Sequence, residues 1–426
     1  MKYRHPSVNV DRILEQKDNI DPLYATCANG AQYRKDVHGF LPEMMQKIYD
    51  ERVQSKKLML IAKQEYENNP SVELEKSISK YNNIQMARKI QLNSAYGAIG
   101  NNYFRYYNLR NAEAITLSGQ VSIRWIENKV NAYLNKLLNS NDKDYVIASD
   151  TDSIYICLDD LVTKVYGDKE VSQEKVVDFL DKACKEKIEP FIDRSYQELA
   201  TYANAYEQKM FMKRENIAAR GIWTAKKRYI LNVWNSEGVQ YSKPKLKMMG
   251  IEAVKSSTPA PCRTAIKDAL NIMMSGTQSE LINFISKFKD EFYNMEPEDI
   301  AFPRSVNGLS KYRSTTDVYS KGTPLHVRGS LLYNFYVSKK KLENIYPLIQ
   351  EGEKIKYVHL KVDGKNNYMQ EDVFSFLNTF PRQLGLEVCI DKKKQFYKSF
   401  LAPLQIITDV IGWETEKKGS LEAFFV

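Results

Sequence analysis

Apolar residues spaced three and four positions apart recur along the segment that follows the first forty residues of the chain. Over Leu41–Glu67 this spacing predicts one long amphipathic helix. The polar segment 68–71 interrupts the pattern, and Ser71 is a typical N-cap residue, so we expect a second helix over Val72–Tyr96. Two long helices joined by so short a loop predict a protruding antiparallel hairpin.

The pattern changes several times along the rest of the chain. We expect irregular structure or short strands over 1–40, a helix over 110–138, a β-hairpin over 145–157, a helix over about 175–206, strands over 215–239 and mainly helices beyond Gly250. Helices and strands therefore follow one another without an internal repeat or a low-complexity segment.

The composition is that of a folded protein. The chain has 426 residues, of which 43% are hydrophobic and 27% charged, and this balance excludes a disordered chain. No apolar run approaches the roughly 18 residues that span a bilayer. The five cysteines are scattered and form no Cys-x-x-Cys pair, which argues against a zinc site and a disulfide framework. The net charge of +9 is weak evidence for a polyanionic partner.

Two aspartates, Asp150 and Asp152, lie between two apolar β-branched runs within the expected hairpin. Residues two apart on a strand face the same side, and a tight turn lets both carboxylates converge. Carboxylate oxygens are the ligands that Mg²⁺ prefers. The alternative is a polar turn whose aspartates only accept backbone hydrogen bonds, and by themselves the two residues favour that alternative.

The expected helical hairpin carries a second group of candidate residues. On its first helix Arg52 and Lys56 are four apart and share a face. One face of its second helix has a cation, an amide and a ring, followed by a glycine: Lys89, Asn93, Tyr96 and Gly97. Such a surface fits a nucleoside triphosphate, because arginine and lysine both bind phosphate. The alternative is an ordinary solvated helix face.

These residues carry a resemblance to a known family. The segment 89–97 resembles the Lys-x-x-x-Asn-Ser-x-Tyr-Gly motif of family B DNA polymerases, 150–153 resembles their Asp-Thr-Asp-Ser motif, and 226–229 resembles their Lys-Lys-Arg-Tyr motif. The order and spacing match as well. Segments 102–111 and 243–250 are similar to the replicative polymerases of T-even-type phages, and the resemblance runs over nearly all of the chain.

The resemblance implies an α+β fold shaped like a right hand, without the N-terminal and exonuclease domains of the family. It implies a palm lead-in over 1–40, helical-hairpin fingers over 41–100, an antiparallel-sheet palm over 101–250, a mainly helical thumb over 251–416 and a clamp-binding tail over 417–426. The implied reaction is template-directed nucleotidyl transfer from a dNTP to a primer 3′-hydroxyl, with two Mg²⁺ ions.

The resemblance also implies a role for individual residues. The implied catalytic residues are Asp150, Asp152 and Lys89. The implied dNTP-binding residues are Arg52, Lys56, Lys89, Asn93, Tyr96 and Gly97. The implied metal ligands are Asp150, Asp152 and Glu215. The implied contacts to primer–template DNA are Lys226, Lys227, Arg228, Tyr229 and Lys255. The implied contacts to a sliding clamp are Leu421, Phe424 and Phe425.

The chain departs from the family in its first residues. The palm motif Asp-x-x-Ser-Leu-Tyr-Pro, which supplies another metal-binding aspartate, does not occur, and Asp21–Tyr24 is only a superficial echo of it. We therefore expect a split polymerase whose N-terminal chain, with the exonuclease domain, supplies that aspartate. Ala148 and Ser149 also replace the usual Tyr-Gly pair. The expected location is the cytoplasm of an infected bacterial host, with no membrane partner.

Two other functions stay open at this stage. One is a catalytically inactive factor that binds primer–template DNA and the clamp, although the candidate aspartates and cations are all present. A reverse transcriptase or an RNA polymerase is a weaker possibility, because the motif on the second helix of the hairpin differs from theirs.

Overall fold

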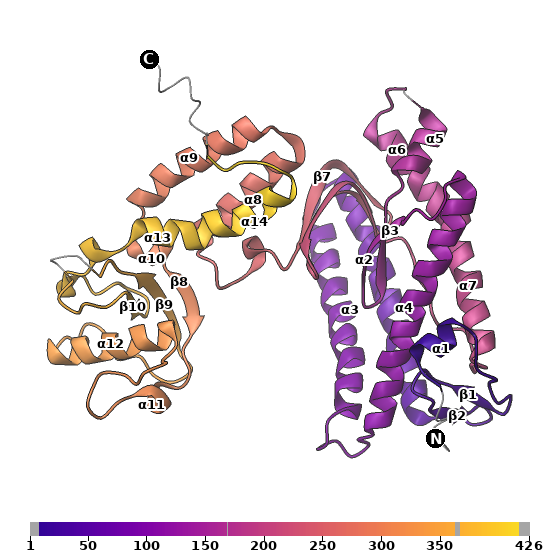
Figure 1. Cartoon of the computed structure of the whole chain (residues 1–426), viewed down its shortest axis with the longest axis horizontal. Coiled ribbons are helices and arrows are strands. Elements are labelled where there is room, and N and C mark those ends of the chain that lie inside the picture. The colour runs from indigo at the N-terminus through magenta and orange to yellow at the C-terminus, as the bar shows by residue number, and fades with distance from the viewer. Residues whose placement is uncertain (1–7, 168, 363–366, 417–426) are drawn as a thin grey trace. The chain divides into compact units, whose positions relative to one another are not determined.

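The computed structural model describes residues 8–167, 169–362 and 367–416 (Figure 1). Contacts divide the chain into two compact units, Met1–Ala219 with Val233–Lys245, and Arg220–Asn232 with Leu246–Val426. In the described residues, helices and small antiparallel sheets follow one another, which agrees with the predicted α+β class. Within this described part, no helix combines the length and the apolarity that crossing a membrane requires.

The first unit is mainly helical. Its elements are α1 (Val10–Leu14), β1 (Tyr24–Thr26), β2 (Gln32–Arg34), α2 (Phe40–Asn68), α3 (Val72–Ile99), α4 (Leu109–Leu138), β3 (Val146–Asp150), β4 (Ser153–Ile156), α5 (Asp159–Tyr166), α6 (Gln173–Ala183), the π-helical turn η1 (Cys184–Ile188) and α7 (Glu189–Tyr202). Three further strands form one sheet in the order β5-β6-β7, and each has residues in both units. They are β5 (Asn216–Ala225), β6 (Arg228–Ser236) and β7 (Val239–Met249).

The predicted helical hairpin is present as α2 and α3, which run side by side (Figure 1). Ser71 is the N-cap of α3, and its hydroxyl accepts a hydrogen bond of 3.2 Å from the backbone N–H of Leu74. The buried residues of the two helices are few: Met59, Ala62 and Gln85. The hairpin is therefore largely solvent-exposed. The sequence predicted the hairpin itself, but most apolar residues of its first helix, such as Met44, Leu58 and Ile61, are exposed and do not form a buried face.

The core of the first unit lies under α4 and α7. The apolar residues of α4 face this core, and Ile126, Val130 and Leu134 are completely inaccessible to solvent. The indole N–H of Trp125 on α4 donates to the carbonyl of Ser195 on α7 at 2.8 Å, which satisfies a buried donor and joins the two helices. Helix α4 also contacts both strands of the β3–β4 hairpin.

The single helix predicted over 175–206 is interrupted. The chain forms α6, then the π-helical turn η1, then α7, and Pro190 lies at the start of α7. Proline has no N–H and its ring collides with the carbonyl four residues earlier, so the preceding turn widens from α to π geometry. The same arrangement recurs in the second unit, where the π turn Tyr397–Leu401 precedes Pro403.

The second unit surrounds a three-stranded antiparallel sheet in the order β10-β9-β8. Its elements are η2 (Glu252–Val254), α8 (Ala260–Ser275), α9 (Gln278–Asn294), α10 (Pro297–Ile300), β8 (Phe302–Ser305), α11 (Leu309–Tyr312), α12 (Leu325–Lys339), β9 (Lys354–His359), β10 (Val373–Phe376), η3 (Arg382–Leu384), η4 (Glu387–Cys389), α13 (Lys392–Phe396), η5 (Tyr397–Leu401) and α14 (Ala402–Val410). Helices predominate beyond Gly250, as predicted, but this sheet was not predicted. Its strands are only four to six residues long, and apolar runs that short do not separate strand from helix.

A buried histidine makes the stability of the second unit depend on pH. His359 at the end of β9 is 1% exposed, and burial, followed by the charges of Lys398 and Lys394, lowers its pKa to about 4. An unfolded histidine has a pKa near 6.5. Between pH 7 and pH 5 this histidine is therefore protonated in the unfolded chain but not in the folded one. Acidification over that range lowers the free energy of unfolding by about 2 kcal/mol.

We predict that His359→Gln removes this part of the pH dependence. Hydrogen exchange of the β9 and β10 amides, corrected for intrinsic rates, should show a larger loss of protection from pH 7 to pH 5 in the wild type than in the variant. An equal loss in both proteins would mean that His359 titrates at its ordinary pKa.

Candidate functional site

The β3–β4 hairpin carries Asp150 and Asp152 at its turn, as the sequence predicted. Asp150 is the last residue of β3 and pairs with Ser153, so Thr151 and Asp152 form a two-residue turn. The backbone N–H of Asp152 donates to the carbonyl of Asp150 at 2.6 Å, and the Thr151 hydroxyl donates to the Asp150 carboxylate at 3.0 Å. Thr151 has a φ of 57°, which is strained for a β-branched residue. Strain of this kind concentrates at functional sites.

A buried tyrosine lies within electrostatic range of Asp152. Tyr196 on α7 is 3% exposed, and burial, followed by the charge of Asp152, raises its pKa to about 12. Its hydroxyl is therefore protonated at neutral pH. Asp152 itself is exposed, whereas Asp150 is half-buried.

The two aspartates fit a divalent cation in chemical type but are too few to hold one alone. Mg²⁺ takes hard oxygen ligands in octahedral geometry. Across residues 8–167, 169–362 and 367–416, the structure has no group of three or more His, Cys, Asp or Glu side chains placed to share a metal ion. Glu215, the third predicted ligand, is thus not assembled into such a group with Asp150 and Asp152. A divalent cation bound at this turn would therefore need further oxygen ligands besides these two carboxylates.

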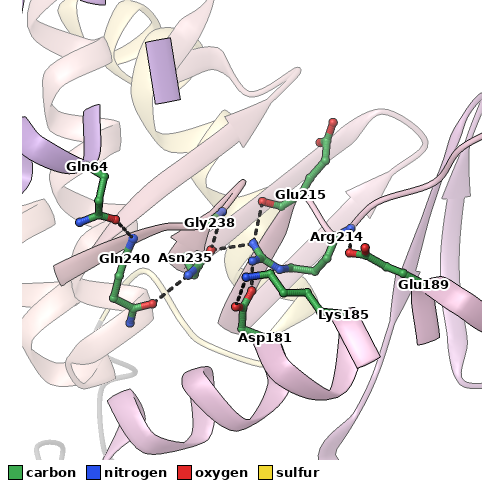
Figure 2. Close-up of polar contacts among 9 residues, drawn as sticks. All are labelled: Gln64, Asp181, Lys185, Glu189, Arg214, Glu215, Asn235, Gly238 and Gln240. Carbon is green, nitrogen blue, oxygen red and sulfur yellow. Dashed lines mark hydrogen bonds and ion pairs between the residues drawn. The ribbon is translucent and has the colours of Figure 1, made fainter. Parts of the chain in front are cut away.

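Glu215 follows a buried arginine that the sequence analysis did not identify. The side chain of Arg214 is only 8% exposed, and its guanidinium forms an ion pair with Asp181 of α6 and donates to Asn235 of β6 at 2.6 Å. Its backbone N–H donates to the carboxylate of Glu189 on α7 at 2.9 Å. Figure 2 shows these partners converging on Arg214 while the carboxylate of Glu215 points away from them.

Burial lowers the pKa of Arg214, because removing its charge from water disfavours the ionised form. A buried charge of this kind is retained only when it is paired and hydrogen-bonded. The only sequence signal was an arginine among the polar residues between the predicted helix and the strands, and an exposed arginine gives the same signal.

The predicted nucleotide-binding cations lie on the α2–α3 hairpin. Glu51 of α2 and Arg88 of α3 form an ion pair of 2.8 Å, which places Lys89 at the level of Arg52 along the two antiparallel helices. Arg52 is half-buried and Lys89 is exposed. Lys56 already has a partner, because its ammonium forms an ion pair of 2.5 Å with Glu237 in the β6–β7 turn.

The predicted base-facing residues form an open surface on α3. Asn93 is exposed, and Tyr96 is 43% exposed. A Cβ atom added to Gly97 would meet no atom within 4 Å. The exposed ring of Tyr96 therefore lies next to Gly97, whose backbone is not covered by a side chain of the residues that the structure describes.

The predicted DNA contacts lie in the second unit, and they are not equivalent. Lys226 is exposed in the turn between β5 and β6. Arg228 forms two hydrogen bonds with Glu252, at 2.9 and 2.8 Å, and Lys255 pairs with the same carboxylate at 2.8 Å. Burial opposes ionisation of Glu252, but these bonds outweigh it and lower its pKa. The charge of Arg228 is therefore largely neutralised within the protein.

Two further predicted DNA contacts have distinct environments. Lys227 is exposed and has a φ of 62°, and its carbonyl lies where a Cβ of Gly250 would be, at 2.4 Å, so only glycine fits at position 250. Tyr229 is 7% exposed and packs near Trp223, with ring centroids 6.2 Å apart. Its ring supports the sheet, and in this position it does not offer a free face to DNA. The predicted clamp-binding residues Leu421, Phe424 and Phe425 lie outside the described residues.

Comparison with known proteins finds similarity to DNA polymerases. The model of DNA polymerase family B matches residues 8–174. A DNA-directed DNA polymerase of Enterobacteria phage T4 is 36% identical over 365 residues, which cover 83% of this chain and 40% of that protein. One of Escherichia phage RB69 is 33% identical over 478 aligned residues, which cover 97% of this chain and 51% of that protein.

A shorter match shows how far the similarity extends. A DNA polymerase beta of African swine fever virus is 35% identical over 106 residues, which cover 24% of this chain and 8% of that protein.

The chain belongs to DNA polymerase family B. Within that family it is of the T4 type, with both phage relatives aligned over most of its length. It spans about half or less of the length of these relatives.

The different environments of Lys226 and Arg228 lead to a prediction about DNA binding. Each phosphate contact contributes roughly 0.9 to the slope of log affinity against log salt concentration. We predict that Lys226→Gln lowers this slope by about that amount on a primer–template duplex, whereas Arg228→Gln changes it far less, because Glu252 already neutralises Arg228. Fluorescence anisotropy across a salt series measures both slopes. Equal decreases would show that Arg228 leaves Glu252 to contact a phosphate.

Proposed function

We propose that this chain is the C-terminal catalytic part of a DNA-directed DNA polymerase. The reaction is template-directed transfer of a nucleotidyl group from a dNTP to a primer 3′-hydroxyl. The observation that carries the proposal is the strained two-residue turn that holds Asp150 and Asp152, in a chain aligned with phage polymerases over most of its length. In this proposal α2 and α3 are the fingers, the sheet-bearing middle of the chain is the palm, and the region beyond Gly250 is the thumb.

The proposed roles follow from charge and exposure. As the 3′-oxygen bonds to the α-phosphorus, the bond to pyrophosphate breaks and negative charge accumulates on the leaving group. Arg52, Lys56 and Lys89 neutralise that charge, and preorganised cations of this kind supply much of the rate enhancement of phosphoryl transfer. Tyr96 and Gly97, next to Asn93, pack against the nascent base pair.

Asp150 and Asp152 would hold divalent metal ions, and we propose two Mg²⁺, whereas Glu215 is not grouped with them and is not proposed as a ligand. Bound there, the metal would supply Lewis-acid stabilisation of the developing charge. Lys226, Lys227 and Lys255 would contact the backbone of the primer–template. Lys255 and Arg228 share the Glu252 carboxylate, but the side chain of Lys255 is 41% exposed and that of Arg228 only 22%. Arg228 and the buried Tyr229 would therefore support that surface.

We propose that an N-terminal partner chain completes this site. Within the residues that the structure describes, β3 and β4 form a sheet of only two strands, one face of which packs against α4. Its edge strands can pair with a further strand, and an aspartate on that strand would add a third carboxylate to Asp150 and Asp152. The motif Asp-x-x-Ser-Leu-Tyr-Pro on the partner would supply that aspartate. The segment 417–426 would tether the enzyme to a sliding clamp, in the cytoplasm of an infected bacterium.

One observation favours a second candidate function. The missing three-member carboxylate group among the described residues also fits an inactive factor that binds primer–template DNA and the clamp. The two functions differ in whether Asp152 matters for DNA synthesis, because an inactive factor needs no carboxylate at the turn.

Primer extension tests the proposal. We predict little extension by this chain alone and robust extension after addition of a partner that carries Asp-x-x-Ser-Leu-Tyr-Pro. In the reconstituted enzyme, Asp152→Asn should lower the rate by at least roughly a hundred-fold, because it removes a charge that acts on the transition state. Asp159→Asn, at an exposed position at the start of α5, is the matched control and should leave the rate unchanged.

Three results would contradict parts of this proposal. Robust extension by the chain alone would remove the need for a partner. An unchanged rate in Asp152→Asn would favour the inactive factor. No extension with the partner would exclude the proposed catalytic role.

A further inference from the structure

The β6–β7 turn places a glutamate in an unfavourable backbone conformation. Glu237 and Gly238 form this two-residue turn, with φ angles of 53° and 92°. A turn with two positive φ angles prefers Asn-Gly or Gly-Gly, so glutamate at its first position is strained. The surrounding contacts must therefore hold Glu237 in place.

A buried polar network holds this turn. The side-chain oxygen of Asn235 accepts hydrogen bonds from the backbone N–H of Gly238 at 3.1 Å and from Arg214 at 2.6 Å, and its amide N–H donates to Gln240 at 2.8 Å. Arg214 is in turn paired with Asp181 of α6 (Figure 2). The turn is thus fixed to the helical layer of the first unit, and Glu237 projects from a rigid support.

Helix α2 lies along this hairpin through polar contacts on one side of the helix. The contacts are the ion pair Lys56–Glu237, the hydrogen bond from the backbone N–H of Gln240 to the side chain of Gln64, and the ion pair Glu67–Lys245. The first contact differs from the others, because Lys56 is one of the cations assigned to the triphosphate. Its side chain is 32% exposed and that of Glu237 is 24% exposed, so the pair is partly shielded from solvent.

We propose that Glu237 competes with the nucleotide for Lys56. In the absence of nucleotide, the Glu237 carboxylate occupies the Lys56 ammonium and holds α2 against the β6–β7 hairpin. A triphosphate then has to replace one carboxylate with its own oxygens, while the contacts of Gln64 and Glu67 remain as the support of the helix. Glu237 is a positioning residue in this proposal, which rests on the proposed nucleotide-binding role of the α2–α3 hairpin.

The expected effect of Glu237 on nucleotide affinity is small. A partly exposed ion pair alters an equilibrium by a modest amount, which corresponds to about a two- to five-fold change in affinity. Glu237→Gln keeps the shape of the side chain and removes its charge. It should therefore tighten nucleotide binding by about two- to five-fold, and this gain should vanish when Lys56 is also replaced by Gln.

Chemical acetylation of lysines in the full chain, read by mass spectrometry, tests the contact without any need for catalysis. Glu237→Gln should raise the reactivity of Lys56 and leave that of Lys245 unchanged. Glu67→Gln is the matched control, because it breaks the neighbouring ion pair on the same helix, and it should raise the reactivity of Lys245 alone. Unchanged reactivity of Lys56 in Glu237→Gln would overturn the proposal.

A second arm tests the competition with dATP and Mg²⁺ in the presence of primer–template DNA. The dATP concentration that half-protects Lys56 from acetylation should be about two- to five-fold lower in Glu237→Gln than in the wild type. An equal or higher concentration in the variant would overturn the competition. No protection in either protein would also overturn it, whereas failure of the proposed polymerase function is read separately from primer extension with Asp152→Asn.

Discussion

The buried guanidinium of Arg214 is the constraint that positions the β6–β7 turn and, through Glu237 of that turn, the candidate cation Lys56. A charge removed from water costs several kcal/mol unless ionic and polar partners surround it. Here the partners come from α6 and β6, while the backbone of Arg214 is tied to α7. The start of β5 and the β6–β7 turn are therefore held to the same helical layer, and this positions both Glu215 and Glu237.

The candidate residues divide into a rigid group and an exposed group. Those at turns of the sheets, such as Asp150 and Glu237, are held by backbone hydrogen bonds, and Thr151 and Glu237 in these turns have positive φ angles. Those on the α2–α3 hairpin lie on two helices with few buried residues. Such an element has a small apolar contact area with the rest of the unit, so polar contacts contribute a large share of what holds it. The Lys56–Glu237 ion pair is one of these contacts.

Sequence periodicity predicted the helices well where one face of a helix meets a core or where a clear cap begins it. The α2–α3 hairpin, the Ser71 cap and helix α4 were all predicted, because their spacing and local chemistry do not depend on distant partners. The division of the helix after Lys175 and the short sheet of the second unit were not predicted. Pro190 changes one turn from α-helical to π-helical geometry, and the apolar spacing on either side stays helical, so the sequence pattern does not reveal the change. Segments of four to six residues form strands here because they pair with segments distant in the sequence.

The same distinction applies to the site. The sequence by itself determined the family and the residue types at Asp150, Asp152 and Lys89, because motif spacing is a local property. Only the tertiary structure decided which charges are already neutralised. Arg228 is paired with Glu252 and Lys56 with Glu237, and each partner lies at least 24 positions away in the chain. Ion pairs and burial depend on which residues come into contact in the folded chain, and the spacing of residues along the sequence does not specify these contacts.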